Sequence, residues 1–126
     1  MNLSTLLLGI SFLTLNFPPA SKTADLAAFE VIEKRTEYNG IYYSYAIKNV
    51  GTATIPSDSY KVLLKVDGKT ASFDKATSEI KPGQTIVYHA QKTFYQKSED
   101  KLNYSLEIKF SDSNLANNTL TGESIF

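Results

Sequence analysis

Several residue types that carry chemistry are absent from this sequence or nearly so. It contains no cysteine, which excludes disulfides, thiolate metal sites and a cysteine nucleophile. Its single histidine, His89, excludes clusters of histidine ligands and most histidine-based acid–base designs. Tryptophan is also missing, and the aromatic residues are 8 Tyr and 7 Phe, a set that favours strands. The chemistry open to the chain is therefore narrow.

The sequence also lacks net charge. It carries 13 Lys and Arg against 13 Asp and Glu, so its formal net charge is zero. A surface that tracks phosphates needs a basic excess, so we expect neither a nucleic acid nor an anionic membrane as a partner. At 126 residues, with no internal repeat and no low-complexity segment, the chain has the length of about one domain.

An uncharged stretch at the N-terminus is the longest apolar feature. The segment from Leu6 to Phe17 is almost continuously apolar. It is shorter than the ~20 residues that a membrane-spanning helix needs, but it suits the apolar region of a secretory signal. Ala20 and Ala24 follow as candidate cleavage residues. Because no Lys or Arg precedes the segment and neither site is A-x-A, a buried strand or a retained anchor stays open as an alternative.

These features predict that residues 1–24 are a signal peptide with a short linker and that residues 25–126 form one domain. The protein is then secreted, periplasmic or held at the cell surface, and the mature chain has no transmembrane span. A domain of about 100 residues can bury enough apolar surface to fold without a disulfide.

Apolar and polar residues alternate after residue 26, and no helical period is sustained. Half-buried antiparallel strands have this pattern. Weaker strands are expected at 28–34, 70–73 and 119–126, which brings the count to about seven. The four clear strands are predicted to turn these residues inward: Ile41, Tyr43, Tyr45 and Ile47; Tyr60, Val62, Leu64 and Val66; Ile86, Tyr88 and Ala90; Leu102, Tyr104, Leu106, Ile108 and Phe110.

Turn residues separate these runs. Asp67-Gly68 is a strong signal for a two-residue hairpin, and Pro82-Gly83 predicts a turn before the next strand. About seven short strands at regular spacing predict an all-β fold, an immunoglobulin-like antiparallel sandwich of two sheets. Tyr104 lies where such folds can place a tyrosine corner, and an ordinary core tyrosine is the alternative.

The stretch "IKNVGT" ends one of the clear strands. Asn49 is expected to bond nearby backbone, and Gly51 is expected to accept a positive φ. Val50 between them is expected to keep an apolar contact. We therefore interpret these residues as a strand end and not as a site.

Four stretches of the chain follow one another in a recognisable order: IKNVGTATI (47–55), VLLKVDGK (62–69), IKPGQT (80–85) and YSLEIKFSDSNLANNT (104–119). Together they resemble the CARDB domain, the cell-adhesion-related domain found in bacteria. The resemblance covers residues 27–126 and implies an immunoglobulin-like sandwich used outside the cell as a spacer or adhesion module, with no catalytic residues. The chain departs from the family in its last hairpin, where "NLA" replaces acidic residues, and in carrying a single copy.

Candidate catalytic groups are few. Asp74 with Glu79, or Glu99 with Asp100, could form acid–base pairs, but both pairs lie in charged segments typical of solvated surface. His89 alternates outward and has no Asp or nucleophile beside it in the sequence. No phosphate loop or nucleophile elbow is present. We therefore predict that the protein is not an enzyme and has no cofactor.

The best metal candidate is the stretch "DSNLANN", which offers side-chain oxygens suited to Ca²⁺ from Asp112, Asn114, Asn117 and Asn118. One carboxylate among four ligands predicts a weak site. Asp and Asn are also good turn residues, and the turn interpretation is favoured. No metal site is therefore expected.

Three tyrosines are the best candidates for a binding surface. Tyr42 points away from the predicted core, and Tyr38 and Tyr95 lie in or near connections. Exposed tyrosines can stack on sugar rings or anchor a protein contact, although they can also pack on a covered face or shield an edge. We predict an exported non-enzymatic module for adhesion, protein interaction or spacing, whose partner is a protein or glycan at the cell surface. The alternative is a secreted carbohydrate-binding or inhibitor protein on the same fold.

Overall fold

The computed structural model describes residues 23–75, 77–96, 101–110 and 115–126, and these residues are almost entirely β-strand. A short 3₁₀ helix, η2 (Leu115–Asn117), precedes the last strand. The strands are β1 (Leu26–Arg35), β2 (Gly40–Asn49), β3 (Lys61–Val66), β4 (Lys69–Lys75), β5 (Thr85–His89), β6 (Phe94–Tyr95), β7 (Lys101–Lys109) and β8 (Thr119–Ile125).

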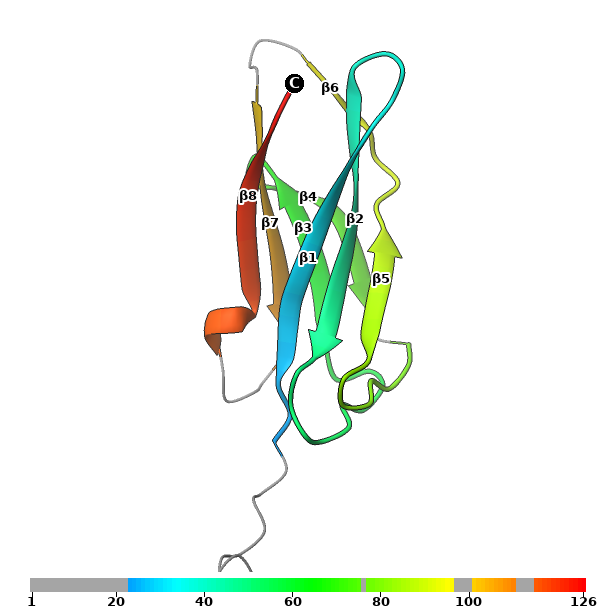
Figure 1. Ribbon diagram of the computed structural model, residues 1–126, viewed down its shortest axis with the longest axis vertical. Coiled ribbons are helices and arrows are strands. Elements are labelled where there is room, and N and C mark those ends of the chain that lie inside the picture. Colours follow the sequence, from blue (N-terminus) through cyan, green and yellow to red (C-terminus); the bar gives the residue numbers. More distant parts are fainter. Residues whose placement is uncertain (1–22, 76, 97–100, 111–114) are drawn as a thin grey trace, which may run out of the picture.

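The strands form two four-stranded antiparallel sheets that pack face to face, with the first sheet in front in Figure 1. In the first sheet β2 pairs with β1 on one side and with both β5 and β6 on the other. The second sheet has the order β4-β3-β7-β8. The predicted two-sheet sandwich is confirmed. The pattern missed β6 because two residues are too few to show an alternation.

The predicted inward faces form the core. In β2, Ile41, Tyr43, Tyr45 and Ile47 are all 0% exposed. β3 and β7 supply the opposite wall, and Tyr104 of β7 packs against Tyr43 with ring centroids 5.6 Å apart. The ring of Tyr104 also covers Gly122 of β8, where a Cβ would lie 2.3 Å from its hydroxyl. Tyr104 is thus a core tyrosine that packs between the sheets.

The predicted hairpin signals are confirmed. Asp67 and Gly68, between β3 and β4, have φ of 51° and 82°. Both residues occupy the left-handed region that a tight two-residue turn requires. Gly83 also has a positive φ, 82°, in the Pro-Gly turn before β5.

Asn49 closes the lower end of the sandwich in Figure 1, and its side chain is 0% exposed. Its Nδ2 donates to the carbonyls of Ala53 (2.8 Å) and Ile80 (2.9 Å). Its Oδ1 accepts a hydrogen bond from the backbone N–H of Gly51 at 3.0 Å. The prediction that Asn49 bonds nearby backbone is confirmed, and the carbonyl of Ile80 extends it to a second loop.

Two details of this corner differ from expectation. Gly51 is absent from the positive-φ residues and is needed for space instead, because a Cβ there would lie 2.3 Å from the carbonyl oxygen of Thr23. Val50 is 47% exposed, so the predicted apolar contact is wrong. Its backbone N–H donates to the carbonyl of Asp25. The chain has already left the strand at this position.

Two polar clusters close the sides of the sandwich. Between β1 and β8, the hydroxyl of Tyr43 donates to Ser124 Oγ at 2.8 Å, and Ser124 is hydrogen bonded to Glu33. Arg35 also binds Glu33, at 2.8 Å. The hydrogen bond with Ser124 lowers the pKa of the Glu33 carboxyl, and Arg35 lowers it further. Burial raises this pKa, but the net result is a value below the usual one. Burial raises the pKa of Tyr43.

The second cluster lies between β2 and β4. The hydroxyl of Tyr45 donates to Asp74 and lies 2.7 Å from Ser72 Oγ. Burial, followed by the hydrogen bond to Asp74, raises the pKa of Tyr45 well above its usual range. Tyr88, which stacks on Tyr45 with centroids 5.5 Å apart, also has a raised pKa because of its burial. These tyrosines are neutral structural groups.

Candidate functional site

Two tyrosines lie on the outer face of the first sheet, at the upper end of Figure 1, and a third lies in the adjoining loop. Tyr95 of β6 lies directly opposite Gly40 of β2. Tyr42 follows two residues later on the same face of β2. Tyr38 is in the loop between β1 and β2 and is 81% exposed, while Tyr95 is 54% exposed. The sequence selected these residues one by one, and the structure places them at one end of one sheet.

Glycine at position 40 makes this arrangement possible. A Cβ on Gly40 would lie 2.8 Å from the ring of Tyr95 and 2.7 Å from the Thr36 hydroxyl. The Tyr95 ring therefore packs on the backbone of Gly40, in the space that a side chain at position 40 would occupy. Thr36 fixes the loop that carries Tyr38, because its Oγ1 accepts the N–H of Gly40 at 2.9 Å and its own N–H donates to the Gly40 carbonyl.

His89 extends this surface toward β5. It lies opposite Ser44 of β2, and its Nδ1 is 2.8 Å from Ser44 Oγ. The sequence places no nucleophile beside His89, but the structure brings Ser44 to it from a strand 45 residues away. The pair lies on a sheet face, and its hydroxyl belongs to a residue only 4% exposed. A buried hydroxyl cannot reach a substrate, so we assign the pair a structural role.

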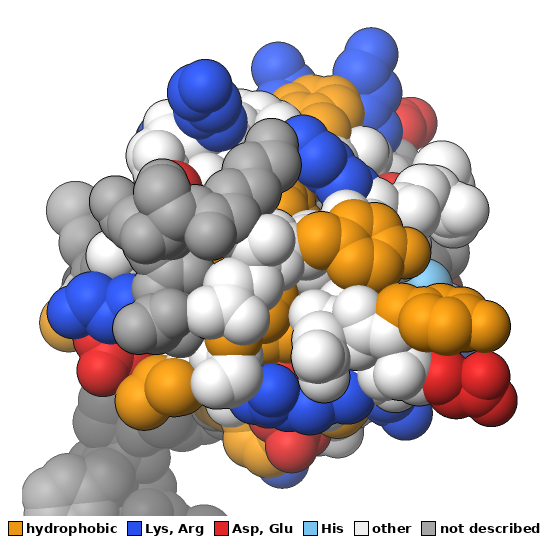
Figure 2. Space-filling model, turned by 90° about the horizontal axis from the view of Figure 1, so that it is seen from above, with side chains coloured by type: hydrophobic (Ala, Val, Ile, Leu, Met, Phe, Trp, Pro, Cys, Tyr) orange, Lys and Arg blue, Asp and Glu red, His pale blue; other side chains and the backbone are white. Residues whose placement is uncertain are grey.

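We call Tyr38, Tyr42, Tyr95 and His89 together the tyrosine face. Figure 2 looks down on this end of the molecule, and orange side chains flank the pale blue histidine, His89. Tyrosine side chains combine a rigid apolar ring with a hydroxyl that donates and accepts hydrogen bonds. The tyrosine face therefore suits contact with a protein or a sugar.

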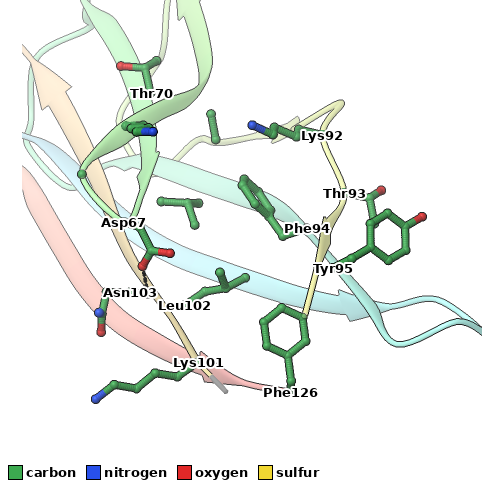
Figure 3. A pocket seen from close by; sticks show the side chains of 14 residues that line it. Asp67, Thr70, Lys92, Thr93, Phe94, Tyr95, Lys101, Leu102, Asn103 and Phe126 are labelled. Atoms are coloured by element: carbon green, nitrogen blue, oxygen red, sulfur yellow. Dashed lines mark hydrogen bonds between the residues drawn. The ribbon is translucent and has the colours of Figure 1, made fainter. Parts of the chain in front are cut away.

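A cleft of about 750 Å³ opens beside the tyrosine face, between the upper ends of the two sheets. Phe94, Leu102 and Phe126 supply apolar walls. Figure 3 shows the side chain of Phe94 turned into the cleft, while Thr93 and Tyr95 on either side of it point away. Because Tyr95 also borders the cleft, the cleft adjoins the tyrosine face.

Polar groups surround the mouth of this cleft. The carboxylate of Asp67 accepts the backbone N–H of Asn103 at 3.0 Å, the bond drawn in Figure 3. Lys92 Nζ lies 5.1 Å from the centre of the Phe94 ring, a cation–π distance. Lys101 is 3.5 Å from Glu123. Sequence reasoning missed the cleft because its lining comes from strand ends and turns far apart in the chain.

The other candidate sites are not assembled within the described residues. Asp74 binds Tyr45, and Glu79 is an exposed loop residue. Glu99 and Asp100 lie outside the described residues, as do Asp112 and Asn114 of the calcium candidate.

The described half of the calcium candidate is engaged in the fold. Asn117 donates from Nδ2 to Asp25 at 2.8 Å, and its own Oδ1 is buried without a hydrogen bond. Asn118 is 6% exposed, and its carbonyl accepts the N–H of Ile108. In the described ranges no three His, Cys, Asp or Glu side chains come together as metal ligands. Nor does any helix in these ranges have the length and apolarity to cross a membrane.

Comparison with known proteins supports the fold and not a function. No family model and no curated protein sequence matches the chain. A domain of a protein named as a cell surface protein, from Methanosarcina acetivorans, is 18% identical, with a TM-score of 0.67 over 82% of this chain and 91% of that one.

The CARDB domain of a Pyrococcus furiosus protein, crystallised in complex with di-metal ions, is 17% identical with a TM-score of 0.66. The match covers 84% of this chain and 96% of that one. A solution structure of the same Pyrococcus domain gives a TM-score of 0.65 at 17% identity, over 83% of this chain and 96% of that one. The resemblance carried by the sequence motifs is therefore confirmed at the level of architecture: the chain is a CARDB-like immunoglobulin-like sandwich.

Proposed function

We propose that this chain is an exported, non-enzymatic binding module that contacts a protein at the cell surface through its tyrosine face. The observation that carries the proposal is the position of Tyr42 and Tyr95 on one sheet face, with Tyr38 in the adjoining loop and a cleft beside Tyr95. Tyrosines are enriched among the residues that dominate protein interfaces, and a neighbouring pocket can receive a side chain of the partner. The similarity to a domain of a cell surface protein supports the location.

Site-specific photo-crosslinking on intact cells tests this proposal. A photoreactive residue at position 38 or 95 should give one discrete crosslinked product. The same residue in place of Phe29 is a matched control, because Phe29 is an aromatic residue of similar exposure (50%) elsewhere on the same sheet. Equal crosslinking at all three positions, or none at 38 and 95, would contradict the tyrosine face.

A glycan partner is the second candidate, favoured by the open tyrosine rings. Sugars stack on such rings, and the hydroxyls bind sugar hydroxyls. A glycan array probed with the protein distinguishes the two candidates. A hit that Tyr42→Ala abolishes and Phe29→Ala leaves intact would assign the tyrosine face to carbohydrate.

Export is part of the proposal, and the structure favours one of the two cleavage residues. Thr23 accepts backbone hydrogen bonds from Thr52 and Ala53, and Asp25 accepts one from Val50. Cleavage after Ala24 would remove the bonds of Thr23, whereas cleavage after Ala20 keeps them. We therefore expect the mature chain to begin at Ser21. Intact-mass measurement of the exported protein checks this, and recovery of cytosolic protein beginning at Met1 would contradict export.

We infer that the last hairpin connection acts as a turn and not as a calcium site. The Pyrococcus domain was crystallised with di-metal ions. In this chain the candidate ligands include one carboxylate, Asp112, which predicts weak binding. Calorimetric titration with Ca²⁺ tests the inference. Sub-millimolar binding that is lost in Asp112→Ala would overturn it.

A further inference from the structure

A row of three lysines crosses the outer face of the second sheet at its lower end. The register places Lys61 of β3 opposite Lys75 of β4 on one side and opposite Lys109 of β7 on the other. All three residues are exposed. We call them the lysine row. Because neighbouring strands lie about 4.8 Å apart, three lysine side chains leave the sheet side by side.

Carboxylates offset this charge only in part. Glu107 Oε1 is 3.6 Å from Lys109 Nζ, and its Oε2 is 3.3 Å from Lys65 Nζ, so two lysines share one carboxylate. Across the described ranges, none of the ion pairs involves Lys61 or Lys75. Like charges directly opposite on adjacent strands destabilise a sheet. The three opposed lysines therefore cost some stability, which Glu107 offsets only in part.

One exposed aromatic residue, Phe73, lies in the next row beside the half-buried Leu63. Leu63 of β3 is opposite Phe73 of β4, and Phe73 is 46% exposed. Both side chains lie on the same face as the lysine row, because they are two residues from Lys61 and Lys75 along their strands. The surface therefore offers a ring on which a sugar can lie, next to cations that can bind a carboxylate.

We propose that the lysine row and Phe73 bind an acidic polysaccharide, a polymer with carboxylates that recur along its chain. A line of ammonium groups matches a line of carboxylates, and Phe73 covers the apolar face of a sugar ring. A nucleic acid fits this surface less well. Single-stranded nucleic-acid sites stack several bases on several aromatic side chains, and this surface offers one, Phe73. The surface is on the opposite sheet from the tyrosine face, so the two can be occupied together.

Titration of the purified protein with polygalacturonate tests the proposal. Binding should weaken by at least tenfold between about 50 mM and about 200 mM salt, because the contact is electrostatic. Lys61→Gln and Lys75→Gln should each weaken it by about fivefold. Lys48→Gln is the matched control, because Lys48 is a single lysine beside an aromatic ring, 5.1 Å from Phe29, on the other sheet. That variant should bind as the wild type does.

Three results would overturn the proposal. The first is no binding at low salt, and the second is an equal loss in Lys48→Gln. The third is binding of a thymidine oligonucleotide of the same charge as tightly as polygalacturonate. That result would show that the surface binds polyanions in general and does not select a polysaccharide. Neutral dextran should not bind. The thermal midpoint of Lys61→Gln should equal or exceed that of the wild type, because the substitution removes a like charge, and this shows that any lost binding is not lost folding. Tyr95→Ala should leave polygalacturonate binding unchanged, which separates this surface from the tyrosine face.

Discussion

The two ends of the sandwich differ in how completely their polar groups are used by the fold. At the lower end, Asn49 is fully buried, and both atoms of its amide bond to backbone. At the upper end, the sheets leave a cleft of about 750 Å³, and Tyr38 stands almost free of the fold. A group whose hydrogen bonds are all internal has nothing left for a partner. The most specific motif of the sequence thus serves the fold, while the tyrosine face and the cleft lie at the opposite end of the sandwich.

Asn49→Ala tests the lower end, and we expect it to have the largest effect on the free energy of unfolding. The substitution leaves the carbonyl of Ala53 and the N–H of Gly51 without their partner, while the carbonyl of Ile80 keeps only the N–H of Ile55. A group that loses its partner costs about 1–3 kcal/mol, so we expect a loss of about 3 kcal/mol in the free energy of unfolding. Urea denaturation measures it. A loss below ~1 kcal/mol would show that the corner is not the closed end described here.

Gly51→Ala at the same end should cost about 2–3 kcal/mol. The Cβ would meet backbone atoms, the carbonyl oxygen of Thr23 at 2.3 Å and the N of Asp25 at 2.8 Å. Backbone cannot turn away as a side chain can, so the segment before β1 must shift. Denaturation with urea gives the size of the loss, and faster proteolysis before Leu26 should accompany it.

Gly40→Ala is the matched substitution at the open end, and it should cost less, about 1 kcal/mol. Its close contacts are the ends of side chains, Thr36, Thr93 and Tyr95, which can move. The displaced Tyr95 ring should weaken crosslinking from position 38. If Gly40→Ala lowers the free energy of unfolding as much as Gly51→Ala does, the side chains around Gly40 do not yield more easily than the backbone around Gly51.

Glu33→Gln tests the polar cluster of Glu33, Ser124 and Arg35 through the pH dependence of stability. We expect a smaller effect on the free energy of unfolding. The pKa of Glu33 is lowered in the folded protein, so its contribution is present above its unfolded value, about 4.3, and is lost as the pH falls through the folded pKa. The wild type should therefore lose more stability than Glu33→Gln between about pH 5 and pH 3. Thermal unfolding across this range measures it. Parallel curves for the two proteins would contradict the role of Ser124 and Arg35.

Tyr38→Ala should have the smallest effect on folding, within ~0.5 kcal/mol, because its side chain is 81% exposed. Binding through the tyrosine face should nevertheless fall by at least tenfold, the usual size for an interface anchor of about 1.4 kcal/mol. Thermal unfolding and crosslinking on the same variant measure both quantities. If Tyr38→Ala instead lowered stability and left binding unchanged, Tyr38 would serve the fold and not a partner.

Much of the fold could be predicted because it depends on local pattern. The alternation selected the inward residues of β2, β3, β5 and β7, and the Asp67-Gly68 turn followed from the need for positive φ at both positions. The corner at Asn49 was also predicted, although the reason for Gly51 was not. Its glycine is required by the approach of Thr23, a contact between segments that no local rule describes.

The candidate site could be predicted only as a set of separate residues. Tyr38, Tyr42 and Tyr95 were selected by their outward or loop positions, but nothing in the sequence places Tyr95 on Gly40. Ser44 beside His89 was missed for the same reason. The cleft was missed because its walls are the ends of strands from both sheets.

The sequence by itself determined which side chains turn inward, where the chain turns and that the fold is a two-sheet sandwich, because each of these depends on neighbours a few residues away. The tertiary structure decided which outward residues become neighbours. Lys61 lies between Lys75 and Lys109, and Tyr95 lies on Gly40, only because the register of distant strands places them there. Register is set by the packing of the buried faces, so the outer surfaces, where binding must occur, are a consequence of the core.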